Sequence, residues 1–236
     1  MLDFSQFEWL TFDCYGTLID WEAGILSALR PVIAAHTVTL PDSEILEHFG
    51  EFEAQAEAGQ FTPYREVLET VVRAFGQRLG FCPSLAETRS LPESLGDWPP
   101  FSDTVEALRR LRTRYRLAII SNVDDDLLAL TAKQLQVPFD AVSTAQQARS
   151  YKPSLNNFQM ALEKMGAPRE KILHVAQSLY HDIAPANQLG MKCVWVNRRA
   201  DQPGTGATKK SDAIPDLEVF SLQALTALAV GSRSSW

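Results

Sequence analysis

The sequence is poor in cysteine, in positive charge and in long apolar runs. Three cysteines occur in 236 residues, at positions 14, 82 and 193, and their number and spacing match neither a disulfide framework nor a zinc module. No apolar run reaches the length of a membrane-spanning helix. Acidic residues outnumber Lys and Arg by 29 to 22, for a formal charge of −7, which argues against binding nucleic acid through the overall field of the protein.

The N-terminal residues lack the basic segment and long apolar stretch of a secretory signal. We therefore expect a cytoplasmic protein with reduced thiols, in which Cys14 and Cys193 are buried because both lie in apolar, strand-like runs. Hydrophobic residues make up 45% of the chain, which is enough for a sizeable core. Neither nucleic acid nor a membrane is an expected partner.

Strand-like and helical patterns alternate along most of the chain. A first strand is expected in the segment WLTFDCYG, residues 9–16, and a charged helical stretch without strands follows it. After the Pro99-Pro100 pair, short strands and helices alternate as far as residue 230. This pattern predicts an α/β fold with a Rossmann-like parallel sheet that has helices on both faces.

The helical stretch then predicts a helical cap, inserted after the first strand, over the carboxyl edge of the sheet. In this division, residues 1–20 and 97–236 form the Rossmann-like core domain and residues 21–96 form the helical cap domain. The segment 200–212 is rich in Gly, Pro and Lys and is predicted to be an exposed loop.

Polar side chains stand at the ends of four predicted strands, where open parallel sheets bind their ligands. Ionic groups at such an edge are costly unless they neutralise one another or serve a ligand. Taken singly, each residue also has a plainer explanation as a helix N-cap, a solvated lysine or a turn former. The residues are Asp13 and Thr17, Ser121 and Asn122, Lys152, and Ser178 and Asp182.

The segments that carry them are FDCYGTL, SN after the second core strand, YKPS and HVAQSLYHDIAPANQLG. In order and spacing these resemble the four motifs of the haloacid dehalogenase superfamily, closest to its L-2-haloacid dehalogenase-like branch. The resemblance implies that Asp13 is a nucleophile whose covalent intermediate is released by water. It also implies that Ser121 binds the substrate, that Lys152 offsets developing charge, and that Asp182 holds magnesium or the hydrolytic machinery.

The residue two places after the nucleophile separates two branches of this superfamily. The phosphatase branch resembles D-x-D-G-T, where the second acid protonates the leaving alkoxide, whereas the dehalogenase branch resembles D-x-Y-G-T. This chain has Tyr15, whose unperturbed pKa of about 10 suits it poorly to that role. Gln177 stands where phosphatases carry another acid, and a neutral amide weakens a magnesium site. Both changes favour a leaving group, such as halide, that needs no proton.

The cap departs from the dehalogenase pattern. L-2-haloacid dehalogenases carry a cap arginine that receives the halide, and the corresponding part of this cap, LEHFGEFEAQAEAG, has none. Arg65 is the nearest candidate, with a surface helix arginine as the alternative explanation. Tyr15, Thr17, Asn122 and Ser178 complete the predicted substrate-binding set.

Three hypotheses follow for the activity. The leading one is a metal-independent hydrolase without a cofactor, in which Asp13 displaces halide from C2 of a short 2-haloalkanoate. The second is a magnesium-dependent phosphatase acting on a small phosphomonoester, with Asp13, Tyr15 and Asp182 as the metal site. The third is a non-catalytic protein that keeps the fold. The expected ligand is a small anionic molecule. The sequence is compatible with a homodimer as well as a monomer.

Overall fold

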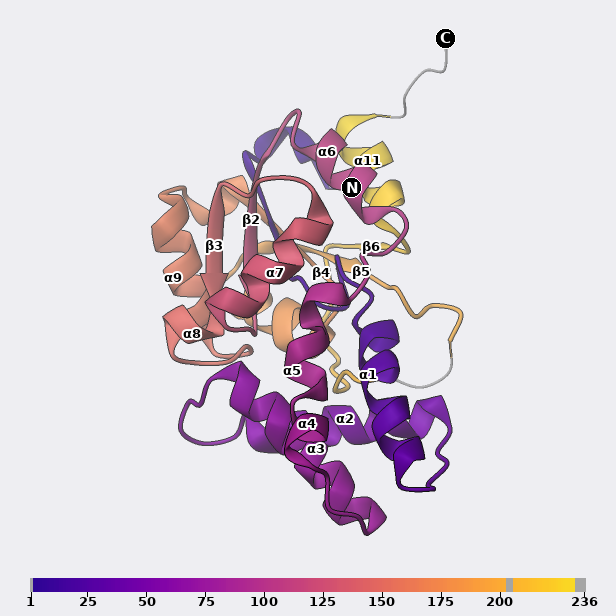
Figure 1. The fold of residues 1–236 in the computed structure, drawn as a ribbon. Helices are drawn as coiled ribbons and strands as arrows, with labels where there is room; N and C mark the ends of the chain where they lie inside the picture. The colour runs from indigo at the N-terminus through magenta and orange to yellow at the C-terminus, as the bar shows by residue number, and fades with distance from the viewer. Residues whose placement is uncertain (1, 203–205, 232–236) are drawn as a thin grey trace.

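The computed structural model describes residues 2–202 and 206–231. Within them, six parallel strands form one sheet in the order β3-β2-β1-β4-β5-β6 (Figure 1). This order changes direction between β1 and β4, and such switch points create a crevice at the carboxyl ends of the strands. The strands are β1 (Trp9–Phe12), β2 (Arg116–Ser121), β3 (Ala141–Thr144), β4 (Ile172–Ala176), β5 (Lys192–Val196) and β6 (Leu217–Val219).

Helices cover both faces of the sheet, as the alternating pattern predicts. Successive strand residues point to opposite faces: Leu10 and Phe12 belong to one apolar cluster, and Trp9 belongs to the other. The first face packs against α6 (Thr104–Leu111), α7 (Asp125–Leu135) and α11 (Leu222–Val230), and the second packs against α9 (Leu155–Met165) and α10 (Ala184–Gln188). Short turns complete this part: η1 (Phe4–Gln6), α8 (Ala145–Ala148), η3 (Arg169–Lys171) and the π-helical η4 (Leu179–Ile183).

The segment between β1 and β2 is helical throughout, as predicted. In Figure 1, α2, α3 and α4 lie together beyond one end of the sheet, and α1 and α5 connect them to it. Pro31 lies inside α1, and the helix continues through it. The elements are α1 (Trp21–Ala35), α2 (Asp42–Ala56), α3 (Tyr64–Leu79), α4 (Leu85–Thr88), α5 (Ser90–Ser94) and η2 (Leu95–Asp97).

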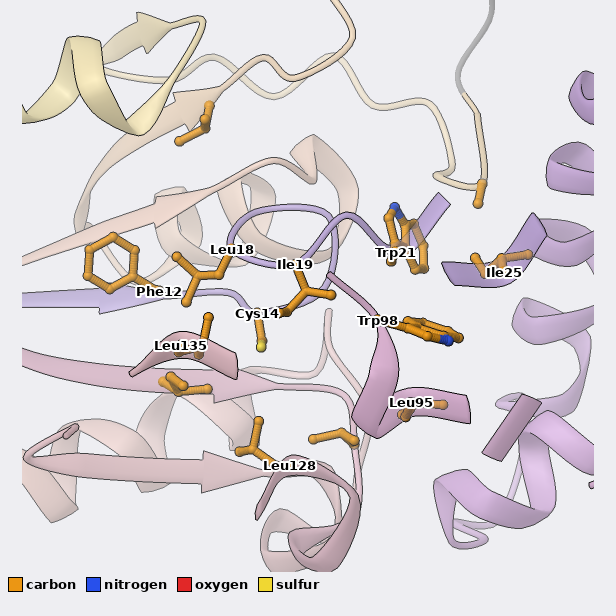
Figure 2. Close-up of a cluster of buried hydrophobic side chains, with 14 of the residues drawn as sticks. Phe12, Cys14, Leu18, Ile19, Trp21, Ile25, Leu95, Trp98, Leu128 and Leu135 are labelled. Atoms are coloured by element: carbon orange, nitrogen blue, oxygen red, sulfur yellow. The ribbon is translucent and has the colours of Figure 1, made fainter. Parts of the chain in front are cut away.

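One apolar cluster extends from the sheet into these helices. Figure 2 follows it from Phe12 and Leu18 through Ile19 to Trp98 and Ile25. Gly24 on α1 allows this contact, because a Cβ added there would lie 2.3 Å from the Trp98 ring. Burial therefore runs without a break from the sheet into the cap helices, and the domain limits drawn from the sequence stay a prediction.

Part of the segment 200–212 differs from the predicted exposed loop. Residues 203–205 lie outside the described residues, but Ala207 and Thr208 are buried. Gly50 of α2 accommodates this approach, since a Cβ at that position would lie 2.5 Å from the Ala207 carbonyl oxygen. Small residues on both sides let the loop pack against the cap, which composition alone does not reveal.

Two other expectations can be compared with the structure. Cys14 and Cys193 are buried free cysteines, as predicted. In the part of the chain that the structure describes, no helix has the length and apolar character needed to span a bilayer.

Replacing Gly24 with alanine tests the packing between α1 and Trp98. Alanine favours the helix by up to about 1 kcal/mol, but overpacking costs about 1–3 kcal/mol, so we expect Gly24→Ala to lower the free energy of unfolding by about 1–2 kcal/mol. Urea unfolding measures this, with Ser27→Ala on an exposed position of the same helix as a neutral or slightly stabilising control. An unchanged midpoint for Gly24→Ala would contradict the close contact.

Candidate active site

Four strand-end residues from distant parts of the sequence line one cavity. Asp13 follows β1, Ser121 ends β2, Lys152 follows α8, and Asp182 lies in η4 after β4. They meet because β1 lies between β2 and β4 and all three strands run in the same direction. The crevice at the switch point therefore brings together the residues that the sequence suggested.

Lys152 bridges the two aspartates. Its Nζ lies 2.9 Å from Asp13 Oδ1 and 2.7 Å from Asp182 Oδ1, and it also donates to the Ile120 carbonyl oxygen at 3.0 Å. Lys152 is only 2% exposed. Burial alone would lower its pKa, but the two carboxylates outweigh burial and raise it. The ammonium therefore stays charged, with all three of its protons donated.

The Asp13 carboxylate is held from both sides. Thr17 donates its hydroxyl to Asp13 Oδ2 at 2.6 Å, and the same hydroxyl oxygen accepts a bond from the Gln177 backbone N–H at 2.9 Å. Gly16 forms the turn with a φ of +88°, which glycine adopts without strain. Burial raises the pKa of Asp13, while Lys152 opposes that rise. Each carboxylate oxygen accepts one bond and keeps a lone pair for nucleophilic attack.

Asp182 is oriented by a buried histidine. His174 Nε2 lies 2.9 Å from Asp182 Oδ1, and its Nδ1 lies 2.9 Å from the Thr11 hydroxyl. Burial would raise the pKa of Asp182, but Lys152 and His174 lower it overall. Its second oxygen, Oδ2, is buried without a hydrogen-bond partner among the described residues. That oxygen is free to accept a bond from a water molecule.

Ser121 and Asn122 have different surroundings. The Ser121 hydroxyl is buried and has no hydrogen-bond partner in the described part of the chain, although it lines the cavity. Asn122 accepts from the Lys152 backbone N–H at 2.7 Å and donates to the Lys152 carbonyl oxygen at 3.2 Å. Ser121 is thus available to a ligand, whereas Asn122 positions Lys152.

The remaining predicted residues do not all reach the cavity. Tyr15 lines it, but its hydroxyl lies 2.8 Å from the Thr131 hydroxyl, and burial raises its pKa well above the ordinary value. Ser178 also lines the cavity, and its hydroxyl accepts the His181 backbone N–H at 2.9 Å, as an N-cap does. Arg65 lies outside the cavity lining, and its guanidinium donates to Asp126 at 2.7 Å.

Two cap glutamates, which the sequence reasoning missed, face the same cavity. Glu53 on α2 and Glu57, the C-cap residue of the same helix, lie one turn apart, and both line it. Tyr64, at the start of α3, donates its hydroxyl to Glu53 Oε1 at 2.5 Å. Burial raises the pKa of Glu53 to about 7, and burial with the neighbouring Glu53 raises that of Glu57 well above its ordinary value. The i, i+4 spacing of two acids in EFEAQAE was the available signal.

The cavity is small and opens toward a wider groove. Its volume is about 40 Å³. On the same scale, one water molecule occupies about 10–15 Å³. A neighbouring groove of about 380 Å³ shares Glu57, Lys152 and His181 with it. Arg149 and Lys209 line this groove, stacked over Phe61 and Tyr180. A substrate of a few heavy atoms fits the inner cavity, and two cations flank its approach.

The donors at the centre do not fit a magnesium ion as they are arranged. Three of the four oxygens of Asp13 and Asp182 already accept bonds, and the Lys152 ammonium bridges the carboxylates that would have to share the ion. Magnesium demands near-octahedral oxygen coordination. Among the described residues, no group of three His, Cys, Asp or Glu side chains is arranged to hold a metal.

The raised pKa of Glu53 predicts a pH-dependent effect on stability. The pKa of Glu53 in the folded protein, about 7, exceeds the ordinary value of 4.5. Its contribution to the free energy of unfolding is therefore complete below about pH 4 and is lost as the pH rises to about 7. Glu53→Gln cannot ionise and should gain up to about 3 kcal/mol over the wild type at pH 8, and much less at pH 5. Urea unfolding at both pH values measures this. The exposed Glu47→Gln on the same helix is the control, and an equal difference at both pH values would contradict the prediction.

Comparisons with known proteins identify the family of the chain. The family model for haloacid dehalogenase-like hydrolases matches residues 10–196. An (S)-2-haloacid dehalogenase of Pseudomonas fluorescens is 25% identical over 224 residues, covering 94% of this chain and 96% of the relative. A glyceraldehyde 3-phosphate phosphatase of Methanothermobacter thermautotrophicus is 32% identical over 107 residues, which cover 42% of this chain and 45% of the relative.

The solved structure of the L-2-haloacid dehalogenase from Xanthobacter autotrophicus superimposes with a TM-score of 0.80 at 21% identity, covering 95% of this chain and 99% of that chain. The matched residues run from the second residue of β1 to the end of β5, and Asp13, Ser121, Lys152 and Asp182 lie within them. By its family match, and in agreement with its fold, the chain belongs to the haloacid dehalogenase-like hydrolases.

Proposed function

We propose that this hydrolase cleaves the carbon–halogen bond of a short 2-haloalkanoate. An oxygen of the Asp13 carboxylate attacks C2 from the side opposite the halogen. The new C–O bond forms as the carbon–halogen bond breaks, and the halide leaves with the bonding electrons. Water then adds to the ester carbonyl carbon, which belongs to Asp13, and releases a 2-hydroxy acid while the carboxylate is restored.

The observation that carries this proposal is the environment of Tyr15. In the phosphatase pattern, the residue at this position delivers a proton to the leaving alkoxide. Here the hydroxyl is bonded to Thr131, the ring packs edge-on against Trp98, and burial raises the pKa further. A group held in this way does not exchange protons with a substrate at neutral pH, and halide needs none.

The second step can use Asp182 and Lys152. Asp182 lines the cavity, and its Oδ2 is buried without a hydrogen-bond partner among the described residues, so it can accept a proton from the attacking water. Lys152 already donates to Asp13 Oδ1, the oxygen on which negative charge would develop if Oδ2 carries the ester. A fixed ammonium beside that oxygen stabilises the tetrahedral intermediate without reorganisation.

The size and polarity of the cavity support a small anion as the substrate. About 40 Å³ suits a two- or three-carbon acid. The free Ser121 hydroxyl is a donor for the substrate carboxylate. The likeness to (S)-2-haloacid dehalogenases over 94% of the chain supports the same class.

A phosphomonoesterase activity is the second candidate, and Glu53 is the observation that favours it. A carboxyl group with a pKa of about 7 on the cavity wall has the properties of a general acid. The partial similarity to a glyceraldehyde 3-phosphate phosphatase supports it as well. Against it stand the small cavity and the arrangement of the carboxylates around Lys152, so we place it second.

The proposal is tested by halide release and by isotope transfer to Asp13. The enzyme should release chloride from chloroacetate or 2-chloropropionate whether or not EDTA is present. Asp13→Asn should reduce kcat on the order of 10⁴-fold or more and remain folded by circular dichroism. A single turnover in H₂¹⁸O should place ¹⁸O in Asp13, detected by mass spectrometry of the peptide.

Two outcomes would contradict the proposal. Phosphate release from small monoesters that requires added magnesium, with no halide release from any haloacid, would establish the phosphatase instead. Halide release with ¹⁸O found only in the product would exclude an ester on Asp13.

A further inference from the structure

The cavity carries more negative than positive groups. Four carboxyl groups line it, those of Asp13, Asp182, Glu53 and Glu57, against the single ammonium of Lys152. His181 adds no charge at neutral pH, because burial lowers its pKa to about 4. With all four acids ionised, the lining would hold a net charge of −3, and an anion would not enter. Binding a haloacid therefore requires that some of these acids are neutral.

We propose that Glu53 and Glu57 bind the anionic substrate as neutral carboxylic acids that donate hydrogen bonds to it, so that substrate binding is coupled to proton uptake. This inference rests on the proposed function, because it concerns how the same cavity holds a 2-haloalkanoate. It assigns substrate recognition to the α2 wall of the cavity.

The geometry around Glu53 fits a proton donor. The residue is 7% exposed, and Tyr64 donates to Oε1, which leaves Oε2 to carry the proton. Tyr64 is fixed in turn, because Asp124 accepts its backbone N–H at 2.9 Å. The carboxyl group is thus oriented from outside its own helix, as a recognition group must be.

Other titratable groups surround the two glutamates and affect their protonation. Tyr64 is the group bonded to Glu53, and its own pKa is raised well above the ordinary value by burial and by Glu53. Glu57 faces Glu53 as a like charge, while Lys152 and Lys209 partly oppose its protonation. Asp182, His181 and Tyr15 are the other titratable groups around the cavity. Among the described residues, neither lysine forms an ion pair with a glutamate: Lys152 is bonded to both aspartates, and Lys209 lies over the Tyr180 ring.

A separate feature indicates that the cavity receives a ligand. The Ser121 hydroxyl is 1% exposed and has no hydrogen-bond partner among the described residues. Burying a hydroxyl group without a hydrogen-bond partner costs free energy. An anion in the cavity would accept a hydrogen bond from this hydroxyl. Ser121 comes from β2 and the glutamates come from α2, so an anion would receive donors from both the sheet and the cap.

The expected signature is a loss of substrate affinity as the pH rises. The binding form has Glu53 and Glu57 protonated, so kcat/KM should be highest below pH 7. It should fall about tenfold per pH unit once one proton is lost, and more steeply if both are lost. The decrease should appear mainly in KM, because the lost interaction holds the substrate.

The experiment measures chloride release from 2-chloropropionate between pH 5.5 and 9 for the wild type, Glu53→Gln and Glu57→Gln. Glutamine keeps an N–H donor that does not titrate. The fold-decrease in kcat/KM from pH 7 to pH 9 should therefore be about ten times smaller for each variant than for the wild type. Glu47→Gln, exposed on the same helix, should follow the wild-type profile.

Binding of unreactive propionate gives a second measurement that does not depend on turnover. Calorimetry in two buffers of different ionisation enthalpy should show proton uptake at pH 8 by the wild type and less uptake by Glu53→Gln. Halide release with a KM that does not rise above pH 7 would overturn the inference and leave the proposed function intact. Tighter binding of a small amine than of propionate would also overturn it, since ionised glutamates would then hold a cation.

Failure of the proposed function would be seen differently. If no haloacid is turned over at any pH, the dehalogenase assignment fails, and proton uptake with propionate still decides whether the cavity binds anions through neutral acids.

Discussion

The buried ammonium of Lys152 is the charge on which the rest of the site depends, because it bonds to one oxygen of each aspartate at the switch point. Removing one partner from a buried ion pair costs about 3–5 kcal/mol, and here it would leave two like charges facing each other. Asn122 holds the lysine backbone, and the Ile120 carbonyl takes the third proton. Sheet topology, a neighbouring loop and the ion pairs therefore all favour a single position for the ammonium.

The same edge of the sheet also positions the cap. Asp124, in the loop after β2, accepts the backbone N–H groups of Tyr64 and Arg65 at 2.9 Å each, at the start of α3. Tyr151, next to the active-site lysine, donates its hydroxyl to the Thr62 carbonyl oxygen at 2.7 Å. These bonds join core loops to the helix that carries Tyr64, and Tyr64 orients Glu53. The acidic wall of the cavity is thus aligned with the nucleophile through hydrogen bonds from the core.

The strand ends could be predicted because their signals are local and the topology follows from alternation. Asp13 follows β1 and Ser121 ends β2, while Lys152 and Asp182 come after β3 and β4 by way of a short helical turn. Parallel strands bring such ends together. The cap wall could not be predicted, since which face of α2 meets the cavity depends on tertiary packing. The absence of an arginine from this part of the cap was visible in the sequence, but the burial of the glutamates was not. Thr208 was missed similarly, because its burial depends on the close approach of Ala207 to Gly50.

Neutral acids at Glu53 and Glu57, as we propose, would give the cavity different electrostatics from a guanidinium at the same place. A guanidinium stays charged at every accessible pH, and beside Asp13 and Asp182 it would compete with Lys152 for both carboxylates. A protonated glutamate donates a hydrogen bond without attracting the nucleophile, so Asp13 keeps its single strong cationic partner. The donor exists only while the proton is bound, and an anion in the cavity stabilises that proton in return. Substrate and proton therefore favour each other's binding, which a permanent charge cannot provide.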